Sequence, residues 1–249
     1  MKFNFDDFDL DSFDTVDFEL PDFDLVDNIF CDDDQNRYVR PKKIKHNARF
    51  CCYNNARKFA NEVKIEKGDR IDALIVGNFI LGDFIEAYMT KYNARTEHMI
   101  ISTLSFSQEN VESLRWLMEH GYIKELDLLT SQFFYAQEKG RLIPYTYKRL
   151  DFDNRFQLTI ANMHSKTVQF ETQGGKKIIL HGSANLRSNN GIEQFTLEEN
   201  PDLYDFYFDV FMRMAERYKT INKETQSSNE TWKIFEQYAN EKAKNKMDT

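Results

Sequence analysis

Short apolar runs that alternate with amphipathic segments constrain the fold of this chain more than any other feature. Three of these runs are six to eight residues long, are rich in branched side chains, and predict buried strands: 71–76, 98–103 and 123–130. Helical spacing fills the segments between them, where Ser107 is placed to cap a helix and Gly121 to end it. Strands that alternate with helices are typical of a layered α/β domain, with helices on both sides of a largely parallel sheet.

The rest of the body continues this pattern and indicates a mixed sheet. Residues 173–176 (QGGK) form a turn signal between two strands predicted over 163–171 and 176–181, so these strands should form a hairpin. We therefore expect a mixed, mainly parallel sheet flanked by helices. The other predicted elements are a helix over 47–64, an irregular helix over 133–149, a strand over 155–161, a helix from Pro201 to about 218 and a C-terminal helix over 230–244.

Charge divides the chain near residue 34. Residues 1–34 carry thirteen acids against one base, Lys2, which gives −12, so the remainder sums to −8 + 12 = +4. Phe and Leu alternate with Asp in this segment, and the strong self-repulsion of a poor strand former predicts a disordered tail. The regular aromatic spacing also fits a docking segment that folds on a protein partner, or that covers a basic groove of its own chain and inhibits it. A purely solubilising tail stays open as an alternative.

These patterns divide the chain into three expected parts: an acidic low-complexity tail over 1–36, an α/β domain over 37–222, and a polar linker with a C-terminal helix over 223–249. No apolar run is long enough for a transmembrane helix, and no basic region precedes an apolar segment, so we expect neither a membrane span nor a secretory leader. The three cysteines, Cys31, Cys51 and Cys52, are odd in number and lack metal-ligand spacing. This pattern favours a reducing, cytoplasmic setting and no bound metal.

A polar constellation gathers around the predicted hairpin. His164 and Lys166 stand two apart, so on a strand both side chains would project from one face. The return strand leads into residues 182–185 (GSAN), back at the level of His164. Such a set suits a phosphate ester, because Lys supplies a point charge, Asn and Ser supply neutral donors, Gly allows close backbone approach, and His can attack or transfer protons.

This constellation resembles the signature of the phospholipase D superfamily, a family of phosphodiesterases and nucleases. The matching order is His164-x-Lys166-(x)4-Glu171, then Gly182-Ser183-x-Asn185, then Glu193. The motif itself covers about 30 residues, and the α/β pattern from about 70 to 220 is similar to the family's single-repeat unit. One departure is that the family usually has Asp where this chain has Glu171, which puts the role of that position in doubt.

The resemblance implies a role for each matching residue. His164 would be the nucleophile that forms a phosphohistidine, or the acid that protonates the leaving group. Lys166 and Asn185 would bind phosphate oxygens, Ser183 would add a hydrogen bond, and Glu193 would orient the histidine. This chemistry needs no metal and no other cofactor.

The family pairs two His-x-Lys motifs in one site, and this chain contains one. None of the other histidines is followed by Lys two residues later: His46, His98, His120 and His181. The resemblance therefore implies a homodimer in which two copies of His164 meet across a twofold axis, one to attack and the other to act as acid.

The favoured interpretation is a metal-independent, nuclease-like phosphodiesterase, a hydrolase that acts on nucleic acid or another phosphodiester. The net charge of +4 on the residues after 34 does not give the strongly basic surface of a typical DNA-binding protein. A catalytically weak or inactive module that binds nucleic acid or phosphate, with an acidic partner-docking tail, therefore stays open. An unrelated α/β scaffold with a chance motif is a further alternative.

Overall fold

The computed structural model describes residues 47–77, 79–187, 191–222 and 227–228, together with Lys233, Gln237 and Asn240. The expected acidic tail and most of the expected C-terminal helix lie outside these residues. Two short strands, β9 (Ile221–Asn222) and β10 (Ser227–Ser228), pair with each other. The other elements are β1 (Asn47–Tyr53), α2 (Ala56–Glu62), β2 (Asp69–Ile75), α3 (Leu81–Tyr92), β3 (Thr96–Thr103), α4 (Gln108–Glu119), β4 (Ile123–Ser131), α5 (Gln132–Glu138), α6 (Leu142–Leu150), β5 (Phe156–Ala161), β6 (Thr167–Thr172), β7 (Lys177–Gly182), β8 (Glu193–Glu199) and α7 (Pro201–Tyr218).

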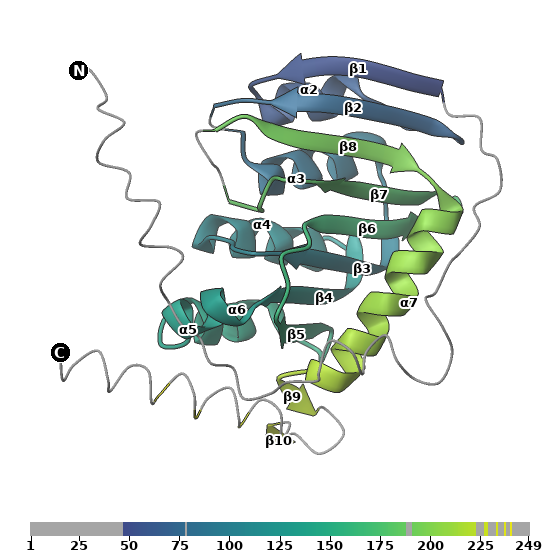
Figure 1. Cartoon of the computed structure of the whole chain (residues 1–249). Helices are drawn as coiled ribbons and strands as arrows, with labels where there is room; N and C mark the ends of the chain where they lie inside the picture. The colour runs from purple at the N-terminus through teal and green to yellow at the C-terminus, as the bar shows by residue number, and fades with distance from the viewer. Residues whose placement is uncertain are drawn as a thin grey trace, which may run out of the picture. The chain divides into compact units, whose positions relative to one another are not determined.

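An eight-stranded mixed sheet forms the centre of the described body, in the order β1-β2-β8-β7-β6-β3-β4-β5 (Figure 1). The pairings β1–β2, β3–β4 and β4–β5 are parallel, and the other four are antiparallel. Six strands therefore run in one direction, while β6 and β8 run in the other. The expected α/β class and the mixed sheet flanked by helices are confirmed.

One face of the sheet is apolar and packs against helices α2 to α4 (Figure 1). Phe195 of β8 lies on this face, with ring centroids 5.3 Å from Phe59 of α2 and 4.9 Å from Phe84 of α3. Phe170 of β6 meets Tyr88 of α3 at 6.4 Å. Since these rings are almost fully buried, this face holds the main hydrophobic core.

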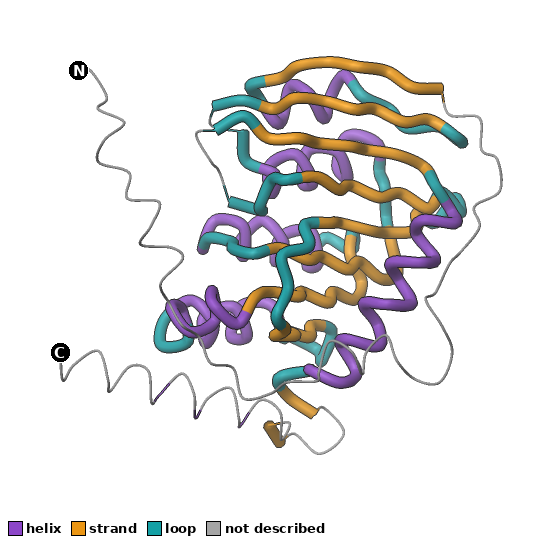
Figure 2. Tube along the Cα trace, in the orientation of Figure 1, coloured by secondary structure: helices purple, strands orange, loops and turns teal. Residues whose placement is uncertain are grey.

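Helix α7 crosses the opposite face (Figures 1 and 2). Several polar side chains lie on this face. Directly opposite residues in a sheet point to the same face, so the pairs Arg70↔Glu198 and His181↔Thr196 project together. Helix α7 packs an aromatic ring against this face, because Phe208 contacts His98 of β3 with centroids 5.7 Å apart. The two faces of one sheet therefore differ sharply in polarity.

Several predicted boundaries are confirmed by local geometry. Ser107 caps α4 through a capping box with Asn110, and Gly121 has φ of +69°, a conformation that favours glycine. The β6–β7 hairpin turns through Gly175, which also has a positive φ. The irregular helix expected over 133–149 is two helices, α5 and α6, separated by residues 139–141.

The helix predicted over 47–64 is wrong in its first half, where residues 47–53 form the edge strand β1. Phe50 seemed to belong to a helical apolar stripe, yet 80 % of its surface is exposed. Asn55 accepts a hydrogen bond from the Lys58 amide at 2.8 Å and so begins α2 only after the strand. An edge strand exposed on both faces has no alternating pattern to mark it, which explains the error.

Candidate active site

The five predicted site residues lie at one edge of the sheet, where six strands end and β6 and β8 begin. His164 and Lys166 directly precede β6, Ser183 and Asn185 directly follow β7, and Glu193 is the first residue of β8. These three strands are neighbours in the order β8-β7-β6. Open α/β sheets bind their ligands outside the carboxyl ends of the strands, so the location suits a site.

His164 and Lys166 lie in the loop before β6 and not on a strand, which corrects the predicted strand over 163–171. The strand begins at Thr167 because ladder pairing with β7 begins there, opposite His181. The loop runs from β5 past the ends of β4 and β3 to reach β6 (Figure 2). His164 is exposed, and the Lys166 ammonium donates to the His164 carbonyl oxygen at 3.1 Å.

Gly182 and Ser183 bind the start of β8. A Cβ atom on Gly182 would collide with the Gln194 carbonyl oxygen, so only glycine allows this backbone approach. The Ser183 amide donates to that same carbonyl at 3.1 Å, and the Gln194 amide donates to Ser183 Oγ at 2.9 Å. Ser183 Oγ in turn donates to the Glu193 carboxylate. Ser183 therefore holds the Glu193 carboxylate in this structure, and its expected hydrogen bond to a substrate stays a prediction.

Asn185 is attached to the end of β3. Its side-chain oxygen accepts a hydrogen bond from the Leu104 amide at 3.0 Å, and Thr103 Oγ1 lies 3.4 Å from the same oxygen. A backbone amide must face an oxygen, so this bond directs the Asn185 NH2 group elsewhere. The free end of Asn185 is a donor, as phosphate binding requires.

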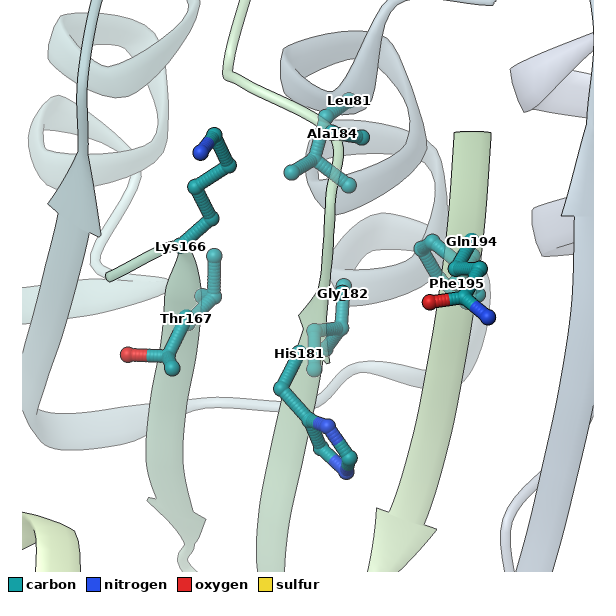
Figure 3. A pocket seen from close by; sticks show the side chains of 10 residues that line it. Leu81, Lys166, Thr167, His181, Gly182, Ala184, Gln194 and Phe195 are labelled. Atoms are coloured by element: carbon teal, nitrogen blue, oxygen red, sulfur yellow. The ribbon is translucent and has the colours of Figure 1, made fainter. Parts of the chain in front are cut away.

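Lys166 lines a shallow, open hollow at this edge. Thr167, His181 and Gln194 share the lining, with apolar contributions from residues that include Leu81 and Ala184. Figure 3 shows Lys166 extended past the end of its strand, while the His181 ring points the other way, along the sheet. The hollow therefore presents one ammonium group and not a pair of imidazoles.

Glu171 lies outside the site. It pairs with Lys177 at the far end of the β6–β7 hairpin, five residues from Lys166. At a strand rise of about 3.3 Å per residue, that places it roughly 17 Å from the lysine. Glu171 therefore does not line the hollow.

The His181 ring belongs to a polar network on the α7 face. Its Nε2 atom lies 2.8 Å from Glu198 Oε1, and Asn200 donates to the same carboxylate at 3.1 Å. Burial acts to raise the pKa of Glu198, but hydrogen bonds from His181 and Asn200 and the charge of Arg70 outweigh it and leave this pKa lowered. A structural or supporting role, rather than a catalytic one, fits this position.

Two buried hydroxyl residues at the end of β3, Ser102 and Thr103, contact both halves of the site, and the sequence reasoning missed them. The only available signal was a Ser-Thr pair at the end of an apolar run, which is common in strands.

Within the described residues, no group of three His, Cys, Asp or Glu side chains is placed to hold a metal ion. No helix in that part of the chain is long and apolar enough to span a bilayer.

Neither a family model nor a curated protein matches this chain. Solved structures with a similar fold include phosphatidylserine synthase from Haemophilus influenzae, at 14 % identity and a TM-score of 0.45, over 70 % of this chain and 46 % of that one. The phospholipase D family member Nuc from Salmonella typhimurium gives 12 % identity and a TM-score of 0.43, over 59 % of this chain and 96 % of that one.

A variant of yeast tyrosyl-DNA phosphodiesterase gives 13 % identity and a TM-score of 0.32, over 51 % of this chain and 31 % of that one. This chain thus spans just under half of the synthase and about a third of the yeast enzyme. At such identities and TM-scores, evidence for function comes from the residues themselves. The chain has an eight-stranded mixed α/β fold, and the similar structures include a member of the family that its motif resembles.

Proposed function

We propose that this chain is a phosphodiesterase of the phospholipase D type, and that it cleaves nucleic acid. The observation that carries this proposal is that His164, Lys166, Asn185 and Glu193 all lie at the same edge of the sheet, with Glu193 29 positions after His164 in the sequence. A reactive imidazole, a fixed cation, an amide donor and a carboxylate are the groups that phosphoryl transfer requires.

In the proposed reaction a His164 ring nitrogen attacks phosphorus and forms an N–P bond. The P–O bond to the leaving alcohol breaks, and an imidazolium supplies the proton that the departing oxygen takes up. Water then loses a proton to this second, now neutral imidazole as it attacks phosphorus, the N–P bond breaks, and both histidines return to their starting protonation states. Lys166 and the Asn185 NH2 group neutralise and orient the phosphate oxygens throughout.

The second imidazole would come from His164 of a partner subunit. The hollow of one chain offers a single lysine and turns the His181 ring away from it (Figure 3). A twofold axis past the sheet edge would supply an identical histidine to act as acid. When wild-type protein exchanges subunits with a tenfold excess of His164→Asn protein, most wild-type subunits enter mixed dimers. The activity per wild-type subunit should then fall strongly, whereas an unchanged activity per wild-type subunit contradicts the shared site.

Cleavage of a labelled single- or double-stranded oligonucleotide in the presence of EDTA tests the proposal directly. His164→Asn should abolish cleavage, and His120→Asn serves as the matched control because His120 ends α4 and takes no part in the site. A phosphorylated histidine trapped in the wild-type protein would identify the nucleophile. Absence of cleavage of DNA, RNA and a small bis-aryl phosphodiester would eliminate the enzymatic proposal.

A phosphate-binding module without turnover is the second candidate, and one observation favours it. In the described part of the chain the His164 ring takes part in no hydrogen bond or ion pair, so its orientation is not fixed within one subunit. Binding of an oligonucleotide that survives His164→Asn but is lost in Lys166→Ala, with no cleavage by the wild type, would establish this function.

The acidic segment 1–34 belongs to the same proposal as a protein-docking or self-inhibitory region. The basis is its net charge of −12, opposite in sign to the rest of the chain. If the segment competes with an anionic substrate, its deletion should raise activity, and most at low salt, where screening is weakest. Equal activity of the full-length and truncated proteins at low salt would leave only a partner-docking or solubilising role.

A reducing, cytoplasmic setting is proposed on the cysteine pattern alone.

A further inference from the structure

The two halves of the candidate site are held by a third segment, the carboxyl end of β3. His164 and Lys166 belong to the loop before β6, and Asn185 follows β7. Strand β3 lies beside β6 in the sheet, and its last residues are more than 60 positions away from either half in sequence. Three consecutive residues there contact both halves through separate hydrogen bonds.

Ser102 holds the His-x-Lys half. Its hydroxyl accepts a hydrogen bond from the Thr167 amide at 3.1 Å, the point at which β6 begins. The same oxygen lies 3.0 Å from Thr167 Oγ1 and 3.2 Å from Ser165 Oγ, and Ser165 is the residue between His164 and Lys166. Ser102 is only 2 % exposed, so water does not compete strongly for these bonds.

Thr103 and the next amide hold the Asn185 half. Thr103 Oγ1 donates to the Ser105 carbonyl at 2.9 Å and accepts from the Leu186 amide at 3.2 Å. The Leu104 amide donates to the Asn185 side-chain oxygen at 3.0 Å. Thr103 therefore fixes the backbone that follows Asn185. The Leu104 amide holds the side-chain oxygen of Asn185, so the NH2 group of that side chain points away from β3.

We propose that Ser102 and Thr103 are positioning residues. Ser102 fixes the His164–Lys166 loop and Thr103 fixes the segment of Asn185, so that both segments are held at the same level of the sheet edge. This inference rests on the proposed function, because the anion that these groups bind is the phosphodiester. The two hydroxyls do not touch the substrate and act through the groups they hold. Displacement of a reacting group by about 1 Å can cost a factor of about 100 in rate, so loss of one anchor should be visible in kinetics.

The decisive test is the isosteric change Thr103→Val, which removes the hydroxyl and keeps the shape. Thr159→Val is a matched control, because Thr159 lies in β5 of the same sheet, is fully buried, and its hydroxyl has no hydrogen-bond partner among the described residues. We expect kcat/KM for oligonucleotide cleavage to fall about 10- to 100-fold in Thr103→Val, mainly through kcat. Thr103→Ser, which restores the hydroxyl, should recover most of the loss, and Thr159→Val should behave as wild type.

Ser102→Ala provides a second variant for the case in which Thr103→Val does not fold, as judged by its circular dichroism spectrum. It should lower kcat/KM by about 10-fold. Wild-type kcat/KM in both folded variants, or an equal loss in Thr159→Val, overturns the positioning role. A loss in Thr103→Val that the Thr103→Ser variant does not recover also counts against it.

Inorganic phosphate binding separates failure of this inference from failure of the proposed function. If the wild type binds phosphate but cleaves nothing, the enzymatic proposal fails, and a several-fold weaker phosphate affinity in Thr103→Val but not in Thr159→Val still supports the anchor. If the wild type cleaves nothing and phosphate binding is the same in all three proteins, the positioning role of Thr103 is wrong. If the wild type neither cleaves nor binds phosphate, both proposals are overturned.

Discussion

The two faces of the central sheet use opposite chemistry to contact their helices. Toward α2, α3 and α4, the sheet presents apolar side chains, with Phe84 and Phe59 at the centre of a cluster of rings. Toward α7, it presents charged and polar groups, with Glu198 at the centre of a hydrogen-bonded network. The first face can supply most of the folding free energy by burial alone, whereas the second must compensate the desolvation of every charge it buries.

This difference teaches that stability and chemistry are separable in this chain. The candidate site lies at the strand ends, next to the polar face, and none of its five residues contributes a ring to the aromatic cluster. Substitutions in the cluster should therefore change stability first, and substitutions at the edge should change activity first.

The largest effect is expected from Phe84→Ala. Phe84 has no exposed surface and stacks or crosses with Phe59, Tyr88 and Phe195 at centroid distances of 5.3, 5.8 and 4.9 Å. Removing the ring leaves a cavity and should lower the free energy of unfolding by about 3–5 kcal/mol in urea denaturation at pH 7. Phe50→Ala, at the 80 % exposed position of β1, is the control and should change it by less than about 0.5 kcal/mol.

A smaller effect is expected from Glu198→Gln on the opposite face. The Glu198 side chain is 1 % exposed and accepts hydrogen bonds from His181 and Asn200, with Arg70 3.6 Å away. The amide keeps the shape but removes the charge that compensates Arg70, so unfolding should become easier by about 1–3 kcal/mol. Glu97→Gln breaks only an exposed pair with Lys124 and should cost less than about 0.5 kcal/mol. Equal losses in the two variants would mean that the polar network does not stabilise the fold.

As pH falls, the charged groups of the polar face should lose their contribution to the free energy of unfolding, whereas the apolar face has no such charges to lose. The hydrogen bond from Arg70 holds the pKa of Asp72 below its usual value, and the pKa of Glu198 is also lowered. A lowered pKa in the folded state gives stability that is fully present above the unfolded pKa of about 4 and is lost as pH falls through the folded value. The free energy of unfolding should therefore stay level from pH 7 to about 5 and fall below about 4. That fall should be shallower in Glu198→Gln, and an identical slope in both proteins would contradict the assignment.

Much of the fold could be predicted from local sequence, and the exceptions have physical causes. Strands β2, β3 and β4 begin and end within two residues of the ranges predicted for them, because each carries an apolar pattern matched to its burial. The edge strand β1 lacks such a pattern, since both of its faces are exposed. The insertion of β8, β7 and β6 between β2 and β3 could not be predicted, because strand order depends on contacts between distant segments.

For the candidate site, the sequence could predict which residues belong together, but not the hydrogen bonds that hold their segments. Motif spacing identified His164, Lys166, Ser183, Asn185 and Glu193, and the structure places all five at one edge. Spacing could not show that His164 precedes its strand, because hairpin pairing with His181 decides where β6 begins. It also could not identify Ser102 and Thr103, whose hydroxyls bond to residues more than 60 positions later in the chain.

The smallest effect on stability is expected from Lys166→Ala, the change that most directly tests the separation of stability from chemistry. The Lys166 ammonium contacts only the His164 carbonyl oxygen among the hydrogen bonds of the described residues, and that bond is exposed to solvent. Exposed polar contacts contribute little, so the free energy of unfolding should change by less than about 0.5 kcal/mol. Phosphate affinity should nevertheless fall at least about tenfold, because this cation is the one that the hollow presents. Paired urea and phosphate titrations check both values, and a loss of stability that matches the loss of affinity would show that the sheet edge supports the fold as well as the chemistry.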